Sequence, residues 1–288
     1  MVVLVKRLFL PTLISVLALV GVCLLLYPST AAWFSQYNQS KLVGEYAHKL
    51  ESVRPDRQAQ LDAATAYNKA LVSGAELKSG ARIASGTGAA RGTWSYNDIL
   101  RADDSGTMGR VRIRKIDVDM PIYHGTSEAT LLKGAGHLEG TSLPVGGAST
   151  RTVITAHRGL ASARLFTDLD KLRKGDTFTL EVFGRVLTYR VFEVQVVAPS
   201  ETRAIEPVPG KDLATLVTCT PLGINSHRIL VTGERVIPTP KDDLAHAGGP
   251  SELPRFPWWA LIFGGTVCAV GAFLTREVRA ARKACGNA

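Results

Sequence analysis

Two long apolar stretches lie near the two ends of the chain, and they limit what the sequence can fold into. Residues 8–26 read LFLPTLISVLALVGVCLLL, and residues 258–274 read WWALIFGGTVCAVGAFL. About 20 apolar residues suffice for an α-helix that crosses a bilayer. We therefore expect membrane helices at residues 8–27 and 257–275, and a folded domain built from the residues between them.

Basic residues flank both stretches on the side of the chain ends. Lys6 and Arg7 precede the first stretch. The basic residues that follow the second stretch are Arg276, Arg279, Arg282 and Lys283. Loops rich in lysine and arginine stay in the cytoplasm. The pattern predicts a two-pass protein of the cell membrane, with residues 1–7 and 276–288 in the cytoplasm and the intervening domain extracellular. A cleaved signal peptide and a buried core helix are the alternatives for the first and second stretch.

The first part of the extracellular region, residues 28–105, has the composition of a helical region followed by a loop. VGEYAHKLESV at 43–53 and RQAQLDAATAYNKALV at 57–72 carry apolar residues at helical spacing, with Pro55 between them. They predict two short helices. Residues 78–95 are rich in glycine, serine and alanine and contain one aromatic residue, Trp94. This composition predicts a mobile, lid-like loop over about 78–98, with Trp94 as the residue that could fill a cleft.

Residues 106–238 change to the alternating pattern of β-strands. Seven segments alternate apolar and polar residues: GRVRIRKI, DMPIY, RTVITA, DTFTLEV, RVLTYRVFEVQVV, LATLVTC and HRILVTGERV. Only ARLFTDLDKLR, at 163–173, has helical spacing. Many short strands separated by turns predict an all-β barrel or sandwich. Residues 239–256 are rich in proline and charge and predict a linker to the second membrane helix.

The predicted topology leaves one cysteine in the extracellular domain. Cys23 and Cys268 fall in the apolar stretches and Cys285 falls in the basic tail, so Cys219 has no partner for a disulfide within the domain. A lone thiol outside the cell is either a buried structural residue or a reactive one. The net charge is +9, and much of the excess lies beside the membrane stretches, where it orients the chain. No zinc-ligand spacing or nucleotide-binding loop stands out, so we expect no metal, no cofactor and no nucleic-acid partner.

The sequence around Cys219 suggests what the thiol could pair with. Cys219 ends one alternating run of TLVTCTPLGINSHRILVTGER, and Arg228 lies at the start of the next. A hairpin brings these two residues onto neighbouring strands about 4.8 Å apart, while His227 points to the opposite face. His157 follows the segment RTVITA, where a strand meets a loop. The remaining histidines are His48, His124, His137 and His246.

These segments resemble the sortases, the membrane-anchored cysteine transpeptidases of Gram-positive bacteria. TLVTC followed by an arginine on the next strand resembles the family's cysteine motif, and ITAHRG resembles its histidine segment. MPIYHGTS, GAGHLEGTSLPVGG, LFTDLDKL and TCTPLGINSHR resemble the pilus-assembling class C. The resemblance implies an eight-stranded sortase-type β-barrel with short peripheral helices. It also implies that His157, Cys219 and Arg228 are the catalytic residues.

The resemblance further implies a substrate. Class C sortases cleave an LPxTG-like sorting signal of pilin proteins through a thioacyl intermediate and transfer it to a lysine amine of another pilin. One feature departs from that class, because its usual lid carries an Asp-Pro-aromatic latch and no Asp-Pro occurs in this chain. Three alternatives stay open. They are a housekeeping sortase that uses a cell-wall precursor amine, a hydrolytic cysteine protease, and a non-catalytic pilus-base or adhesion module tethered to the membrane.

Overall fold

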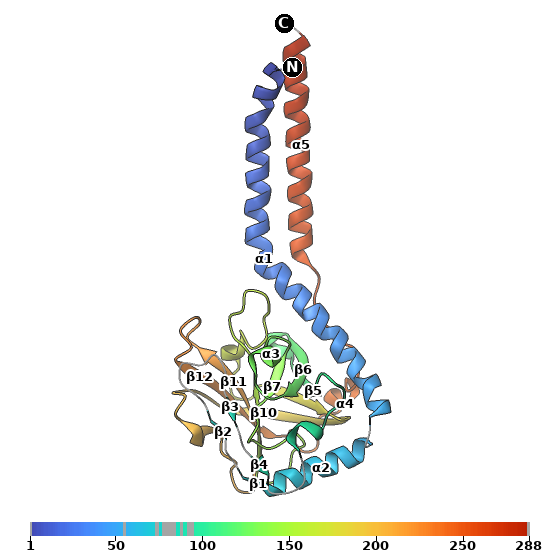
Figure 1. The fold of residues 1–288 in the computed structure, drawn as a ribbon, viewed down its shortest axis with the longest axis vertical. Helices are drawn as coiled ribbons and strands as arrows, with labels where there is room; N and C mark the ends of the chain where they lie inside the picture. Colours follow the sequence, from blue (N-terminus) through green and yellow to red (C-terminus); the bar gives the residue numbers. More distant parts are fainter. Residues whose placement is uncertain are drawn as a thin grey trace. The chain divides into compact units, whose positions relative to one another are not determined.

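The structure is a computed structural model, which describes residues 2–53, 56–72, 75–76, 85–86, 89–90 and 95–286 (Figure 1). Contacts divide the chain into two compact units. One unit contains residues 1–35, 161–163 and 254–288, and the other contains residues 36–160 and 164–253. Trp94, the predicted lid residue, lies outside the described residues.

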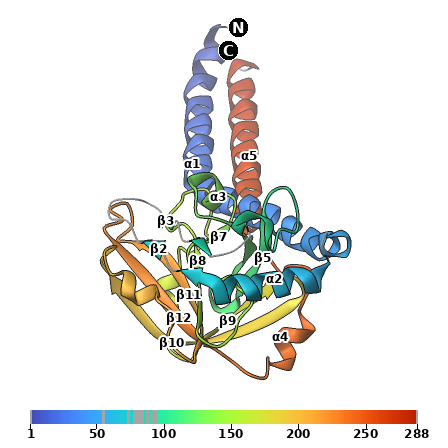
Figure 2. The same cartoon turned by 60° about the horizontal axis from the view of Figure 1, so that its bottom comes forward.

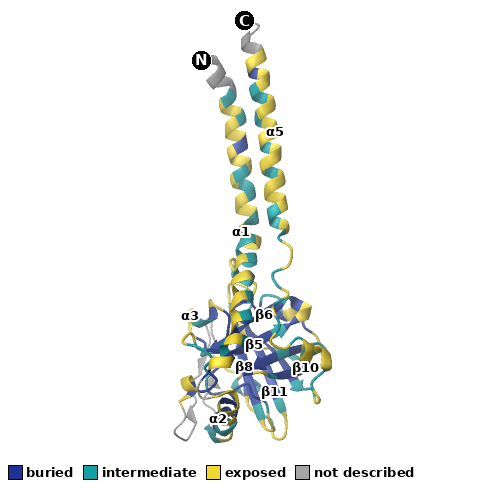
Figure 3. Cartoon of the chain, turned by 90° about the vertical axis from the view of Figure 1, so that its right-hand side faces the viewer, coloured by how far each residue is buried: buried dark blue, intermediate teal, exposed yellow. Residues whose placement is uncertain are grey.

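The two apolar stretches form helices. α1 spans Val2–Ser52 and α5 spans Trp258–Gly286. By length and composition, both are able to cross a membrane, and almost none of their apolar surface is buried within the protein (Figure 3). Near one end of these apolar segments the indole Nε1 of Trp33 donates to the carbonyl of Arg255 at 2.8 Å, and the Trp33 and Trp259 rings lie 6.0 Å apart. Tryptophans are common at the membrane interface.

The prediction of two short helices is half correct. α2, Arg57–Ala70, forms as predicted, and the carboxylate of Asp56 caps it by accepting from the backbone N–H of Ala59 at 2.9 Å. Residues 43–52 are instead the last turns of α1, because no strong helix stop separates them from the apolar stretch. Figure 2 shows α2 lying against the barrel. Its Asn68 side chain exchanges two hydrogen bonds with the backbone of Leu143, at 2.7 and 3.0 Å.

A closed β-barrel of eight strands forms the larger unit, in the order β10-β12-β11-β8-β7-β6-β5-β9. The strands are β5 Thr107–Ile113, β6 Val118–His124, β7 Ala135–His137, β8 Thr150–Thr155, β9 Thr177–Val182, β10 Arg185–Val197, β11 Asp212–Thr220 and β12 His227–Arg235. The pairs β6–β7 and β8–β11 are parallel, and the others are antiparallel. The barrel confirms the predicted fold, and all seven predicted strands are present. The short strand β7 was not predicted.

Short helical elements lie between the barrel strands and on either side of them in the sequence. They are η1 Tyr96–Asp98, η2 Arg114–Ile116, α3 Glu128–Leu131, η3 Leu169–Lys171, η4 Thr202–Ile205 and α4 Lys241–Ala245. Residues 163–173 have helical spacing but contain only the single turn η3. The apolar residues of this segment are spaced as in a helix because they are buried from an irregular loop. They are Leu165, Phe166, Leu169 and Leu172.

Within and just before the predicted loop, the structure describes four two-residue strands. β1 Leu71–Val72 pairs with β4 Ala89–Ala90, and β2 Ala75–Glu76 pairs with β3 Ser85–Gly86. The C-terminal end of the predicted cover, residues 95–98, is anchored to the barrel. Tyr96 is 7% exposed, and its hydroxyl accepts from the backbone N–H of Gly125 at 2.9 Å. Tyr96 is thus a second aromatic residue of this segment, and it packs into the protein.

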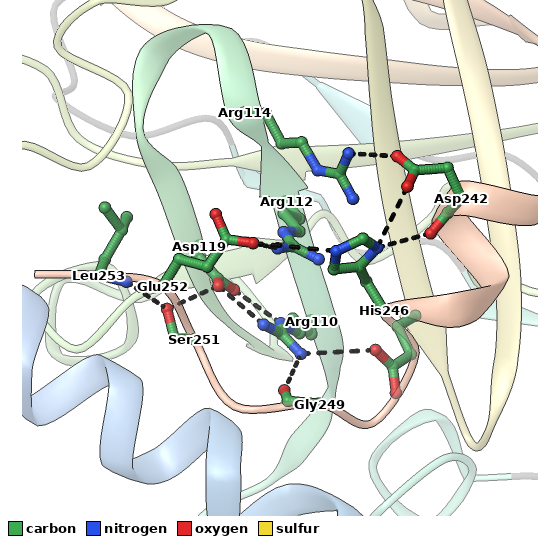
Figure 4. Close-up of polar contacts among 11 residues, drawn as sticks. Arg110, Arg112, Arg114, Asp119, Asp242, His246, Gly249, Ser251, Glu252 and Leu253 are labelled. Carbon is green, nitrogen blue, oxygen red and sulfur yellow. Dashed lines mark hydrogen bonds and ion pairs between the residues drawn. The ribbon is translucent and has the colours of Figure 1, made fainter.

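The segment after β12 is bound to the barrel over residues 241–253, although its composition predicted a linker (Figure 4). Arg110 of β5 donates to the carbonyl of Gly249 at 2.9 Å and makes a two-pronged ion pair with Asp119 of β6 at 2.6 and 2.7 Å. Ser251 donates to the same carboxylate at 2.6 Å. We call residues 241–253 the C-terminal strap.

Candidate active site

Cys219 and Arg228 are directly opposite each other in the β11–β12 ladder. This confirms the prediction that the hairpin places them on neighbouring strands. Cys219 is 5% exposed and Arg228 is completely buried, whereas His227 is exposed on the other face, as the alternation of strand side chains predicts. The site therefore begins as a thiol and a guanidinium on the same face of a two-stranded ladder.

The turn between β11 and β12 holds the arginine in place. Nη1 of Arg228 donates to the carbonyl oxygen of Asn225 at 2.8 Å and to that of His227 at 3.0 Å. Asn225 has a positive φ of 57°, a conformation that asparagine tolerates better than most residues. The local turn geometry thus aims two carbonyl oxygens at a buried cation and fixes its position beside Cys219.

His157 lies in the same pocket as the thiol. The pocket has a volume of about 130 Å³ and is lined by His157, Arg158, Gly159, Leu160, Cys219, Gly223 and Asn225. The imidazole is 5% exposed and comes from the loop that follows β8. The structure therefore brings together the three side chains that the sequence singled out, with His157 and Cys219 lining the pocket and Arg228 buried across the ladder from the thiol.

Burial dominates the electrostatics of the thiol. It raises the pKa of Cys219, while the positive charge of Arg228 lowers that pKa in part. By itself, the charge of Arg228 favours the thiolate. The net shift is upward, because taking a thiolate out of water costs more than this one charge returns.

Glu128 is a site residue that the sequence did not reveal. Its carboxylate Oε1 lies 3.5 Å from Nε2 of His157, and its side chain is 49% exposed. Glu128 begins the short helix α3, where the hydroxyl of Ser127 accepts from the backbone N–H of Thr130 at 3.2 Å. Ser-Glu-Ala-Thr is a recognisable helix start. Nothing in that local pattern links it to a histidine 29 positions later.

The other histidines lie outside this pocket. His137 is completely buried, its Nδ1 lies 2.9 Å from the Tyr96 hydroxyl, and burial lowers its pKa to about 4. His124 contacts the carbonyls of Gly106 and Ile99 at 3.0 and 2.8 Å, and burial lowers its pKa too. These two residues join β6 and β7 to the segment around Tyr96. In the described part of the chain, no three or more His, Cys, Asp or Glu residues are grouped so that they could hold a metal ion.

Comparison with known proteins identifies the site's relatives. Residues 111–236 match the family model of the Sortase domain. A Sortase C from Streptococcus pneumoniae is 41% identical to this chain, with a TM-score of 0.60, over 68% of this chain and 96% of that one. The chain belongs to the sortase family. Members of this family are cysteine transpeptidases.

Further solved structures are similar to this sortase. A pilus-related Sortase C of Group B Streptococcus is 38% identical, with a TM-score of 0.58, over 67% of this chain and 95% of that one. Sortase C-1 of Actinomyces oris is 45% identical, with a TM-score of 0.55, over 62% of this chain and 97% of that one. These structures share the barrel, and the fold expected from the sequence is that of the family.

Curated relatives match over a shorter region. Sortase A of Streptococcus agalactiae is 32% identical over 116 residues, which is 39% of this chain and 47% of that protein. Sortase A of Bacillus anthracis is 29% identical over 134 residues, 46% of this chain and 62% of that protein. This sortase therefore spans less than two thirds of the length of these relatives. The two apolar helices of this sortase are consistent with membrane anchoring.

Proposed function

We propose that this protein is a class C sortase, a cysteine transpeptidase that joins pilin subunits. Cys219 is its nucleophile, His157 its proton donor and acceptor, and Arg228 its electrostatic partner. The observation that carries the proposal is the site itself: a lone thiol shares a pocket with an imidazole and faces a buried guanidinium across one strand pair. The solved Sortase C structures, with their pilus-related names, support the class.

The chemistry begins with cleavage of an LPxTG-like sorting signal. Cys219 gives its thiol proton to His157, and the resulting thiolate attacks the carbonyl carbon between threonine and glycine. The negative charge that develops on the oxygen is stabilised by the charge of Arg228. The tetrahedral adduct collapses as the C–N bond breaks. His157 gives its proton to the departing glycine amine, which leaves a thioester between the threonine and Cys219.

The second half of the reaction uses an amine in place of water. A lysine amine of another pilin attacks the thioester carbonyl, and His157 takes a proton from it. The C–S bond breaks and the thiol is regenerated. The product is an isopeptide bond between two subunits, and repetition yields a covalent polymer.

We further propose that the enzyme works at the outer face of the cell membrane. Residues 8–27 and 257–275 span the bilayer, residues 1–7 and 276–288 lie in the cytoplasm, and the barrel at 106–238 faces outward. Basic residues at both chain ends support this orientation. Protease added to intact protoplasts tests this orientation. We expect cleavage of the barrel domain only, and cleavage of both termini would contradict the proposal.

Intact-protein mass spectrometry is the deciding experiment. The full-length protein in detergent is mixed with an LPxTG-like peptide and a peptide that carries a lysine acceptor. We expect a thioacyl adduct on the parent, no adduct on Cys219→Ala, and a product that contains the lysine peptide. Release of free acid alone would indicate a hydrolytic protease. Preference for a cell-wall precursor amine would indicate a housekeeping sortase, and the absence of any adduct would refute the enzyme function.

A further inference from the structure

Arg158 follows His157 directly and lines the same pocket. Its side chain is 11% exposed, and its guanidinium makes three contacts. Nε donates to the carbonyl of Thr167 at 3.1 Å, Nη1 donates to the hydroxyl of Thr220 at 2.9 Å, and Nη2 lies 2.8 Å from the carboxylate of Asp170. Arginine presents its donors in a rigid plane, so three acceptors in different directions fix the guanidinium firmly.

The partners of Arg158 matter because the backbone ladder ends just before the pocket. The last pair of the parallel β8–β11 ladder joins Thr155 to Val217, an offset of 62 residues. The next contact at the same offset involves a side chain, as the hydroxyl of Thr218 donates to the carbonyl of Ala156 at 2.8 Å. Beyond this point the loop that carries His157 leaves the sheet.

The bond between Arg158 and Thr220 continues this register, because it has the same offset of 62 residues. Thr220 follows Cys219, just as Arg158 follows His157. The bond therefore extends the alignment of the two chain segments past the end of the ladder. His157 and Cys219, which both line the pocket, are separated by the same 62 positions.

The other two contacts of the Arg158 guanidinium bind it to the segment around η3. Thr167 and Asp170 belong to the segment around η3, which also contacts the histidine loop through its backbone. The N–H of Phe166 donates to the carbonyl of His157 at 3.0 Å, and the N–H of Gly159 donates to the hydroxyl of Thr167 at 3.1 Å. Phe166 is completely buried, so the segment is a fixed support.

We propose that Arg158 is a positioning residue, which holds the loop bearing His157 in register with Cys219. This inference rests on the proposed roles of these two residues. A misplacement of about 1 Å in an active site can cost on the order of 100-fold in rate. Arg158→Ala is therefore expected to lower kcat by roughly 10- to 100-fold. The KM for the sorting peptide is expected to stay within about twofold, since the arginine acts through the histidine and binds no part of the peptide.

A first experiment needs no peptide substrate. The rate at which iodoacetamide alkylates Cys219 is measured against pH in the full-length protein, with the Cys219 peptide quantified by mass spectrometry. His157→Ala defines the profile of a thiol without its imidazole. We expect Arg158→Ala to move most of the way toward that profile, Thr220→Val to move part of the way, and Arg158→Lys to restore part of the parent behaviour.

Arg164 provides the matched control. It pairs with Asp168 in the same loop, and its side chain is 50% exposed. Arg164→Ala is expected to follow the parent profile. Thr220→Val, which removes one hydroxyl and keeps the side-chain shape, carries the test if Arg158→Ala does not fold.

Several outcomes would overturn the proposal. One is an Arg158→Ala profile that coincides with the parent, and another is a parent profile that coincides with His157→Ala, because no coupling would then exist for Arg158 to maintain. A rise in KM with unchanged kcat would make Arg158 a substrate-binding residue. If the parent cleaves no sorting peptide, the proposed function fails, while the alkylation profiles still decide whether Arg158 aligns the two side chains.

Discussion

Arg228 is buried directly opposite Cys219, and it is the cation that lowers the pKa of a thiol whose burial raises it. The two effects oppose each other within one strand pair. Because the guanidinium is anchored to the carbonyls of Asn225 and His227, it cannot turn away when the thiol changes its charge. The balance between burial and this fixed charge sets how readily Cys219 becomes a thiolate.

Replacing Arg228 by glutamine should therefore shift the titration of the thiol to higher pH. The reactive species is the thiolate. Without Arg228, no positive charge opposite Cys219 stabilises the thiolate, while the cost of burying it remains. At any pH below the parent midpoint, Arg228→Gln should react more slowly with a maleimide. Arg190→Gln on the neighbouring strand β10, where the side chain is exposed, is the control and should leave the midpoint unchanged. A midpoint that moved to lower pH in Arg228→Gln would contradict this account.

Removing the nucleophile and removing the charge should have different kinetic consequences. Cys219→Ala should abolish transfer entirely and leave the thermal unfolding temperature near that of the parent. Arg228→Ala should keep the thioacyl route but lower kcat by roughly 100- to 1000-fold, the usual loss for an oxyanion donor. Single-turnover kinetics with an LPxTG-like peptide measures both. Transfer by a well-folded Cys219→Ala protein would exclude Cys219 as the nucleophile.

Glu128 should have a small effect on the reaction despite its proximity to His157. The carboxylate is half exposed, and exposed ion pairs contribute at most about 1 kcal/mol, which corresponds to roughly fivefold in rate. We expect Glu128→Gln to lower kcat/KM by about two- to fivefold, because it removes a charge that favours the protonated imidazole. The exposed Glu201 gives a matched Glu→Gln control with no expected effect. A loss of 100-fold or more would mean that Glu128 takes a direct part in catalysis.

The sequence predicted the parts of the site that depend on local spacing. Cys219 and Arg228 lie on two strands joined by a short turn, so alternation alone predicts their pairing and the outward direction of His227. The position of His157 in the same pocket depends on the parallel pairing of β8 with β11. Residue spacing cannot reveal this pairing. Only the family resemblance implied that His157 acts together with Cys219.

Three features of the fold differ from what the sequence pattern indicates. They share a physical cause, because contacts between distant parts of the chain decide the local conformation. β7 has only three residues, Ala135–His137, and is a strand because β6 and β8 pair with it on either side. Leu165, Phe166 and Leu169 are spaced like a helix but are buried from a loop. The C-terminal strap has a linker composition, yet Arg110 and Asp119 from distant strands bind it.

The strap supplies the last prediction, which concerns stability. The side chains of Arg110 and Asp119 are each 3% exposed. Both also bind the strap, since Arg110 donates to the carbonyl of Gly249 and Asp119 accepts from the hydroxyl of Ser251 (Figure 4). Removing one partner of such a pair leaves the other charge buried without its counterion, at a cost of about 3–5 kcal/mol. Arg110→Ala should therefore lower the free energy of unfolding by about this amount, and Ser251→Ala by about 1.5–3 kcal/mol, the usual contribution of a hydrogen bond to a charged group.

Arg114 separates this effect from a general loss of charge. It is the first residue of η2, directly after β5, and pairs with Asp242 of the strap, but both side chains are largely exposed. Because water screens an exposed pair, Arg114→Ala should unfold at nearly the same urea concentration as the parent. Urea unfolding of the full-length protein, followed by barrel circular dichroism, compares the three variants. If Arg110→Ala and Arg114→Ala were equally stable, the buried pair would contribute no more to stability than the exposed one, which would contradict this account.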